Sequence, residues 1–280
     1  LEGLGMPAHP LAVPRDTDIG CLVEEYTGLA AGTHTGKTVS VVGRARAVRD
    51  FGGLVFVDVE EGGARLQLLS DDASSPAHRA LRAGVDVGDL ISATGEVCTS
   101  LTGELSLRVD HWQLAAKCLH PIPAAGTRLS DEVRARDRTL DLLTTTGATD
   151  LLIKRSRGVA AVRRTLQDKG FLEVETPILQ TVHGGAAARP FTTHINAYDM
   201  RLSLRIAPEL FLKRLAVAGL PKIFELGRNF RNEGVDATHN PEFTSLEVYQ
   251  AHADYHTMAT LVHELVVAAA VAVNGTAVVY

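Results

Sequence analysis

The sequence has few cysteines and few aromatic residues. Only three of its 280 residues are cysteines, and 5% are aromatic. Cys21, Cys98 and Cys118 are widely spaced, and no C-x-x-C pair occurs among them. This pattern argues against a disulfide scaffold and against a zinc site, and it suits a reducing compartment.

The sequence also lacks an excess of positive charge. It contains 28 lysines and arginines against 33 aspartates and glutamates, which gives a formal net charge of -5. This balance argues against a broadly basic coat for nucleic acid, although it leaves room for a local RNA-binding patch. With 45% hydrophobic and 22% charged residues, the composition is that of a globular chain rather than a disordered one.

Long hydrophobic runs are missing as well. The longest apolar stretch, residues 265–273, is far shorter than the ~20 residues that a membrane-spanning helix needs, and no signal peptide is visible. The chain starts at Leu1 without an initiator methionine and stops at Tyr280, soon after an Asn-Gly pair typical of a helix end. We therefore expect a part of a longer protein, with a cytoplasmic location.

Short β-rich runs broken by glycine turns occupy the first part of the sequence. They predict a short helix at residues 78–82 and five strands, at residues 38–47, 54–59, 65–69, 89–97 and 104–112. Five strands with a helix inserted between the third and fourth fit a small OB-type barrel. The pattern alone also fits another small β-barrel or a sandwich.

Longer elements follow in the second part. The sequence predicts helices at residues 150–169, 208–215 and 254–273, and strands at 171–174, 202–206, 222–231 and 243–250. Mixed elements in this order indicate an α+β fold. We expect an N-terminal lead-in at residues 1–37, a barrel domain at 38–120, a linker at 121–149 and a second domain at 150–280.

Two of these strands have polar faces of unusual composition. Because side chains alternate along a strand, one face of the first strand carries Glu225, Gly227, Asn229 and Arg231. The matching face of the second carries Phe243, Ser245, Glu247 and Tyr249. An arginine, an aromatic ring and carboxylates in one patch suit an anionic, planar ligand. A half-exposed hairpin with cross-strand charge pairs is the structural alternative.

The motifs around these strands resemble a known family. FRNEG at residues 230–234, followed by HNPEFT at 239–244, resembles the second signature motif of class II aminoacyl-tRNA synthetases, and GFLEVETP at 170–177 resembles the first. GGAAARPF at 184–191 and LRIAPEL at 204–210 narrow the resemblance to lysyl-tRNA synthetases. The resemblance runs from about residue 38 to residue 256. It implies an OB-type anticodon-binding barrel followed by part of a class II antiparallel-sheet catalytic domain.

The resemblance implies ligation of lysine to tRNA(Lys) through an adenylate made from ATP. Arg231 would act in catalysis by holding the α-phosphate, Glu233 would contact the adenine amino group, and Phe243 would stack on the adenine. His239 would reach the terminal phosphates, although it also reads as an exposed loop histidine. The implied ATP-binding set is Arg231, Glu233, His239, Asn240 and Phe243.

A lysine pocket follows from the same resemblance. Glu209 would pair with the ε-ammonium beside Tyr249, while Glu247 and Asn240 would orient the other end of lysine. A strongly hydrated ammonium needs carboxylate partners, which agrees with this set. Glu209 alone would be explained as an acidic residue at a helix start. The implied lysine-binding set is Gly185, Glu209, Asn240, Glu247 and Tyr249.

In the first domain, the resemblance implies that four residues read the anticodon. They are Arg49, Phe56, Gln67 and Glu104. An exposed aromatic ring and amide groups on an OB sheet suit single-stranded RNA. The alternative for Phe56 is a place in the barrel core.

The sequence departs from the family at two points. The third motif and the acidic residues that hold Mg²⁺ are not in this chain, so metal ligands are expected beyond Tyr280 and none within it. Ser203 stands where the family usually carries an aromatic residue, which puts one wall of the amino-acid pocket in question. The resemblance also implies a homodimer built around the first motif.

Other functions remain open. Aspartyl and asparaginyl enzymes share this plan but need a different side-chain pocket. The chain also resembles the synthetase part of actinobacterial bifunctional lysylphosphatidylglycerol synthetases, in which an upstream domain would tether it to the membrane. A non-catalytic tRNA-binding paralogue is a further alternative, against which the intact Arg231, Glu233 and Phe243 argue.

Overall fold

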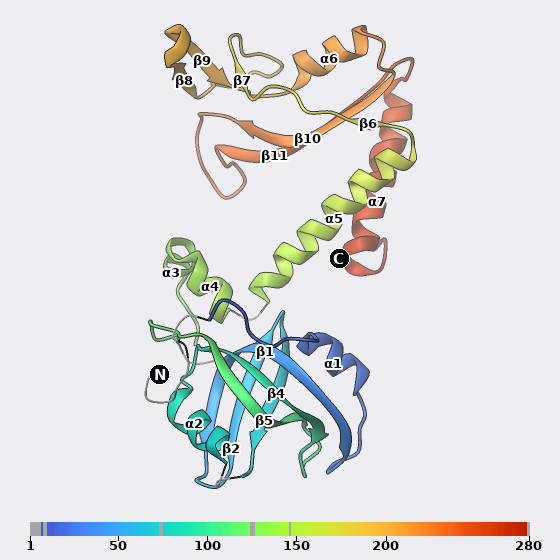
Figure 1. Cartoon of the computed structure of the whole chain (residues 1–280). Helices are drawn as coiled ribbons and strands as arrows, with labels where there is room; N and C mark the ends of the chain where they lie inside the picture. Colours follow the sequence, from blue (N-terminus) through green and yellow to red (C-terminus); the bar gives the residue numbers. More distant parts are fainter. Residues whose placement is uncertain (1–6, 8–9, 73–74, 124–126, 146, 279–280) are drawn as a thin grey trace. The chain divides into compact units, whose positions relative to one another are not determined.

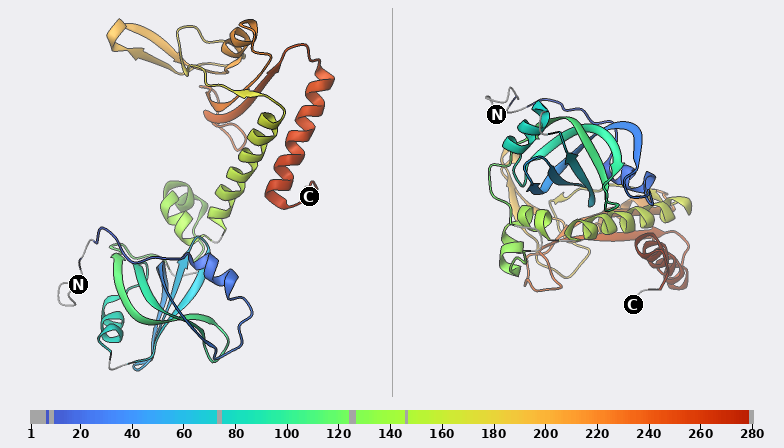
Figure 2. Two further views of the ribbon diagram at one scale, coloured as in Figure 1. Left: turned by 45° about the vertical axis from the view of Figure 1, so that its right-hand side comes forward. Right: turned by 90° about the horizontal axis from the view of Figure 1, so that it is seen from below.

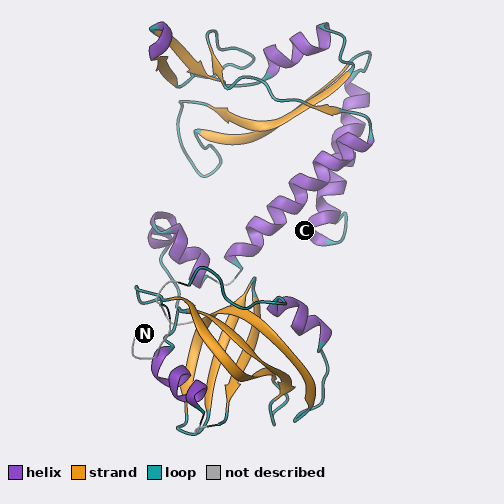
Figure 3. Cartoon of the chain, viewed as in Figure 1, coloured by secondary structure: helices purple, strands orange, loops and turns teal. Residues whose placement is uncertain are grey.

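The computed structural model describes residue 7 and residues 10–72, 75–123, 127–145 and 147–278 (Figure 1). The chain divides into two compact units, Leu1–Ala148 and Thr149–Tyr280. Figure 3 shows that strands dominate the first unit and that helices and strands mix in the second, which confirms the predicted α+β fold.

The first unit is a closed five-stranded barrel with the strand order β1-β2-β3-β5-β4. Neighbouring strands are antiparallel except β3 and β5, which are parallel. This architecture confirms the predicted OB-type barrel, and Figure 2 gives two further views of it. The strands are β1 (His34–Asp50), β2 (Val55–Glu61), β3 (Ala64–Ser70), β4 (Leu90–Thr99) and β5 (Leu105–Ala116).

Alternation along the strands builds the barrel core. On β2, Val55, Val57 and Val59 are buried, whereas Phe56 and Asp58 between them are only half-buried. Trp112 also lies in the core, and its Nε1 donates to the carbonyl of Ala77 at 3.0 Å. A Trp is buried without penalty where its N–H finds such a partner.

Two helices pack against this core. α2 (Pro76–Gly84) covers the predicted helix at 78–82, and Ser75 caps it by accepting from the Ala77 N–H at 3.1 Å. α1 (Ile19–Glu25) lies in the segment expected to be a lead-in, and its Ile19 and Leu22 are buried in the core. β1 also begins at His34, ahead of the expected boundary at residue 38.

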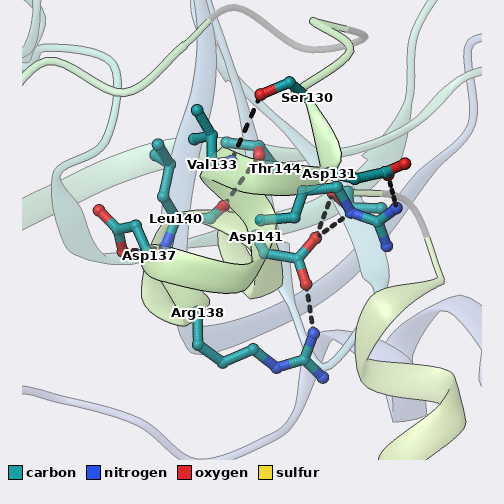
Figure 4. Close-up of polar contacts among 10 residues, drawn as sticks. Ser130, Asp131, Val133, Asp137, Arg138, Leu140, Asp141 and Thr144 are labelled. Atoms are coloured by element: carbon teal, nitrogen blue, oxygen red, sulfur yellow. Dashed lines mark hydrogen bonds and ion pairs between the residues drawn. The ribbon is translucent and has the colours of Figure 1, made fainter. Parts of the chain in front are cut away.

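The expected linker contains two short helices, α3 (Asp131–Arg136) and α4 (Arg138–Thr144). Figure 4 shows the carboxylate that joins them. Asp141 is buried and accepts from Arg134 Nε at 2.8 Å, from Thr145 Oγ1 at 2.8 Å and from Arg138. The hydrogen bond from Arg134 is the main reason why the pKa of Asp141 is lowered. The carboxylate therefore stays charged and holds the two helices together.

The second unit has two small sheets with the orders β11-β10-β6 and β7-β9-β8. β10 and β11 form an antiparallel hairpin, and β6 pairs with β10 in parallel. The strands are β6 (Leu172–Glu173), β7 (Leu179–Gln180), β8 (Thr192–Ile195), β9 (Met200–Leu204), β10 (Lys222–Phe230) and β11 (Glu242–Gln250). The helices are α5 (Ala148–Asp168), the 3-10 turn η2 (Asn196–Tyr198), α6 (Glu209–Val217) and α7 (Tyr255–Asn274).

α5 and α7 lie side by side and antiparallel (Figure 1). Lys169, just after α5, pairs with Glu264 at 2.5 Å, and the other half of α5 approaches the end of α7. Together with β10 they enclose a core of five buried side chains, namely Leu166, Phe171, Phe224, Leu261 and Leu265. This core fixes the hairpin on one side and leaves its other side for the polar residues.

α7 differs from the expectation that no segment is long enough to span a membrane. Its 20 residues are long enough and apolar enough to cross a membrane, because the few polar residues among them add little charge. Helices in the cores of soluble proteins can have the same length and composition. Asp254 begins α7 as predicted, accepting from the Thr257 N–H at 2.9 Å.

Candidate functional site

The register of β10 and β11 gathers the predicted polar residues on one side of the hairpin. Glu225 lies opposite Glu247, Gly227 opposite Ser245, and Asn229 opposite Phe243. We call this side the front face and the side toward Phe224 the back face. Like charges opposite each other destabilise a hairpin, so cross-strand charge pairing does not account for the front face.

Arg231 and Phe243 form one end of the front face. Arg231 follows the last residue of β10, and its N–H donates to the Pro241 carbonyl at 2.9 Å. Its guanidinium carbon lies 5.0 Å from the centre of the Phe243 ring. Within the described part of the chain, the buried Arg231 Nε has no hydrogen-bond partner. A buried donor without a partner is costly, which points to an acceptor supplied by a ligand.

The loop between the two strands carries three further predicted residues. Glu233 accepts from the Arg189 N–H at 3.4 Å, which brings the glycine-rich segment at residues 184–191 to this end of the site. His239 is exposed, and its Nδ1 lies 2.8 Å from Asp236 Oδ1. Asn240 is exposed as well. Among the described residues, no hydrogen bond joins His239 or Asn240 to Arg231, so both remain loop residues in this structure.

Gly185 and Glu209 meet at the other end of the site. Gly185 has φ +88, a conformation that favours glycine, and a Cβ there would lie 2.9 Å from Glu209 Cβ. Glu209 is the first residue of α6, where the helix dipole favours an acidic side chain. Its Oε1 accepts from Lys213 Nζ at 2.6 Å. Glu209 therefore has a cation partner already, and a bound ammonium would compete with Lys213.

Glu247 and Tyr249 lie together on β11. The Tyr249 hydroxyl donates to Glu247 Oε2 at 3.1 Å. Burial raises the pKa of the Glu247 carboxyl, and the charges of Glu209 and Glu225 raise it further. The hydrogen bond from Tyr249 and the positive charge of Arg205 act against this increase. Burial also raises the pKa of Tyr249, so the phenol keeps its proton. The pocket is short of positive charge, which suits a cationic ligand.

The sequence placed Asn229 on the front face but did not predict its burial, and it indicated no role for Arg205. Asn229 is buried, its Nδ2 donates to Ser245 Oγ at 2.5 Å, and its Oδ1 has no partner among the described residues. Arg205 is buried beside Glu225 and had no assigned role. An arginine between Leu204 and Ile206 is the signal that could have drawn attention to it. Ser203, the family departure, is buried on β9 and pairs in register with Gln180 and Thr192.

No metal site is formed by the described residues. Among them, no three His, Cys, Asp or Glu side chains are grouped so that they could hold an ion. The residues that the structure describes therefore do not form a Mg²⁺ site by themselves.

The predicted RNA-reading residues lie on the outer face of the barrel. Phe56 is half-buried and is not part of the barrel core. Its ring centre lies 6.2 Å from that of Phe51 and 5.7 Å from the Arg49 guanidinium. Arg49 also donates to Asp58 at 2.6 Å. Phe56 therefore presents part of its ring to solvent beside a cation, as a stacking platform requires.

Gln67 lies on β3 and is buried, and Glu104 immediately precedes β5. Gln67 Nε2 donates to Glu104 Oε2 at 2.8 Å, and Gln67 Oε1 accepts from Ser106 at 3.1 Å. Both line a hollow of about 320 Å³ whose wall includes Tyr26 of the segment after α1. A second hollow, of about 390 Å³, borders Phe56 and Arg108. Polar groups beside hollows of this size suit unstacked bases.

The chain matches two family models, one over the barrel and one from residue 130 through the second unit. The model of an OB-fold nucleic acid binding domain matches residues 39–115, and the model of class II tRNA synthetases (D, K and N) matches residues 130–279. The second match covers more than half of the chain.

Individual relatives agree with these matches. The chain is 48% identical over 98% of its length to a lysine–tRNA ligase of Kineococcus radiotolerans, of which it covers 56%. It is also 48% identical to the lysylphosphatidylglycerol biosynthesis bifunctional proteins LysX of a Mycobacterium species and of Nocardia farcinica, of which it covers 24%. The chain thus spans about half of the ligase and about a quarter of the bifunctional proteins. It belongs to the class II tRNA synthetases of the D, K and N group, with an OB-fold domain preceding the synthetase domain.

Proposed function

We propose that the complete protein that carries this chain ligates lysine to tRNA(Lys) through a lysyl-adenylate formed from ATP. The observation that carries the proposal is the front face, where an arginine with an unpartnered Nε and an aromatic ring share one hairpin with two carboxylates. The 48% identity to a lysine–tRNA ligase favours lysine over the other amino acids of the group.

The nucleotide would occupy the end of the front face near Arg231. Phe243 offers the adenine a stacking surface, and the unpartnered Arg231 Nε is available to an α-phosphate oxygen. Glu233 would accept from the adenine amino group. His239 and Asn240, both exposed in the loop, would reach the terminal phosphates only if the loop folds over the nucleotide.

Lysine would occupy the end near Glu209. The ε-ammonium would displace Lys213 from the Glu209 carboxylate and lie beside Tyr249. Glu247 and Asn240 would orient the amino and carboxylate groups, and the missing side chain at Gly185 leaves space for the substrate. The excess of carboxylates in this pocket favours a cation over aspartate or asparagine.

The residues of this chain would supply part of the positioning and charge stabilisation, and the rest of the complete protein would supply the remainder. In adenylate formation, a substrate carboxylate oxygen forms a bond to the α-phosphorus, and the bond to the pyrophosphate oxygen breaks. No protein nucleophile is needed, and Arg231 would stabilise the charge that develops on the phosphoryl oxygens. The described residues form no metal site, so the rest of the complete protein would supply the ligands of Mg²⁺.

The barrel would bind the anticodon of the tRNA. Phe56 would stack on an unpaired base, with Arg49 beside it, and Gln67 and Glu104 would read base edges at the first hollow. The net charge of -5 makes this a local contact rather than a broad electrostatic one.

A homodimer is part of the proposal. Leu172, Ile178, Leu179 and Val182, around the first motif, expose large apolar side chains. Grouped exposed apolar residues of this kind favour a protein interface. Sedimentation of the full-length protein at micromolar concentration is expected to give a dimer, and a monomer would contradict the assignment.

A second purpose for the same activity is favoured by the LysX relatives. In it, the lysyl-tRNA would supply a fused membrane enzyme that makes lysylphosphatidylglycerol. Membrane-spanning segments encoded upstream of Leu1 would favour this version, and their absence in the full gene would oppose it.

Amino-acid-dependent exchange between ATP and pyrophosphate tests the proposal. We expect exchange by the full-length protein with lysine, and neither aspartate nor asparagine should replace it. Exchange with one of these two instead of lysine would overturn the substrate assignment. No exchange with any of the three would favour a non-catalytic tRNA-binding paralogue, and tRNA binding measured on the same preparation would then identify it.

A further inference from the structure

Arg205 is a buried charge that the proposed chemistry does not use. It lies between the end of β9 and α6, and only 2% of its surface is exposed. Its main chain joins three segments, because its N–H donates to the Ile178 carbonyl at 2.8 Å and its carbonyl accepts from the Phe230 N–H at 3.0 Å. A fully buried arginine with such connections is costly unless every donor is paired.

The guanidinium is held on the front face by three residues. Nε donates to the Arg228 carbonyl at 2.8 Å, and Nη1 donates to Thr176 Oγ1 at 3.1 Å and to Glu225. Thr176 Oγ1 in turn donates to Glu225 Oε2 at 2.6 Å. The first motif, which ends near Thr176, is thereby tied to β10.

The guanidinium of Arg205 lies close against the sheet at Gly227. A Cβ at Gly227 would be 2.5 Å from Arg205 Nη2. The guanidinium could not move away without losing its hydrogen bonds to Thr176 and Glu225. Arg205 therefore covers Gly227 on the front face, next to its ion-pair partner Glu225.

The charges around Arg205 are mostly negative. Glu225 is its direct partner, and Glu247 lies opposite Glu225 in the hairpin. Glu209 also acts on Glu247, which has the Tyr249 hydroxyl as its hydrogen-bond donor. Of these groups, Arg205 is the one cation that acts to keep Glu247 charged.

We propose that Arg205 is a positioning residue for the amino-acid pocket, which fixes its floor through Thr176 and Glu225 and offsets the charge of the surrounding carboxylates. The proposal rests on the proposed lysine-dependent function of this site. Arg205 is bonded to Arg228, Thr176 and Glu225, so its effect on lysine would pass through Glu225 and Glu247. Removing its charge makes Glu247 easier to protonate, and a protonated Glu247 no longer attracts an ammonium group.

Variants of the full-length protein test this role by their lysine and ATP kinetics. In Arg205→Gln, we expect the KM for lysine in exchange to rise by roughly tenfold or more, as for a displaced positioning group, while the KM for ATP stays near that of wild type. The acidic limb of kcat/KM for lysine should move to higher pH. Arg205→Lys keeps the charge, so its acidic limb should stay in place.

Two further variants keep the test decisive. Arg201→Gln removes an exposed arginine from β9 and serves as the matched control, with unchanged kinetics. Glu225→Gln removes a negative neighbour of Glu247, so its acidic limb should move to lower pH, opposite to Arg205→Gln. This variant decides the question if Arg205→Gln does not fold.

The outcomes separate this proposal from the proposed function. If wild type shows no lysine-dependent exchange, the function itself fails. If wild type is active but Arg205→Gln and Glu225→Gln lower only the melting temperature, with the KM for lysine and the pH profile unchanged, Arg205 has a purely structural role. The proposal is then overturned.

Discussion

Replacing Phe56 by alanine should weaken tRNA charging and leave adenylate formation unchanged. The ring lies on the outer face of the barrel, whereas Arg231 and Glu247 lie in the other unit. Stacking of a base on an aromatic ring is worth about 1–3 kcal/mol. The KM for tRNA should therefore rise by roughly 5- to 150-fold, with lysine-dependent exchange at the wild-type rate.

The cost in stability follows from the neighbours of Phe56. The edge-to-face contact with Phe51 contributes about 0.5–1.5 kcal/mol. The Arg49 guanidinium over the ring contributes about 0.5–1 kcal/mol at an exposed site. A phenylalanine in the barrel core would cost about 3–5 kcal/mol on truncation. A small loss of stability and a large loss of tRNA affinity are therefore expected together.

Charging, exchange and thermal melting on one preparation separate these effects. Val57→Ala is the matched control, because Val57 is the next residue of β2 and is completely buried. It should lower the melting temperature without a specific change in the KM for tRNA. A fall in stability of about 3 kcal/mol or more for Phe56→Ala, with an unchanged KM for tRNA, would place Phe56 among the packing residues and refute the reasoning.

Three predictions concern the other unit. Arg231→Ala should lower the exchange rate by about 10²–10³-fold with little change in melting temperature, and a rate within a few-fold of wild type would contradict its role. Tyr249→Phe removes a hydrogen bond that lowers the pKa of Glu247, so the acidic limb of kcat/KM for lysine should move to higher pH; a shift to lower pH would contradict this sign. Gly185→Ala should raise the KM for lysine and cost about 1–2 kcal/mol of stability, because φ is +88 and the Cβ would crowd Glu209; normal lysine affinity would remove Gly185 from the pocket wall.

The barrel could be predicted because its signals are local. Alternation such as that of Val55, Phe56 and Val57 assigns each side chain to a face without knowledge of the rest of the fold. α1 could not be predicted in the same way. It has only seven residues, and Asp18 before it makes no capping hydrogen bond, so burial of Ile19 and Leu22 against the barrel determines the helix.

At the front face, too, local patterns predicted the strands but not the contacts between residues distant in sequence. Strand alternation predicted which side chains share the face, and the register of β10 and β11 agrees with it. The role of Arg205 was not predicted because it depends on hydrogen-bond partners that are distant in sequence. Thr176, Glu225 and Arg228 come to it only because the segment after β9 lies against both the first motif and β10, which no local pattern contains.

The front face contains groups that lower the stability of the fold, and these groups indicate what kind of ligand the face would bind. Glu225 and Glu247 place two carboxylates opposite each other, and the buried Arg231 Nε and Asn229 Oδ1 lack partners among the described residues. Each unsatisfied buried group costs about 1–3 kcal/mol, and nothing in the back-face core requires them. An acceptor beside Arg231, a donor beside Asn229 and a cation beside the carboxylates would offset these costs. The phosphate and the ammonium-bearing amino acid of the proposed reaction would supply such groups.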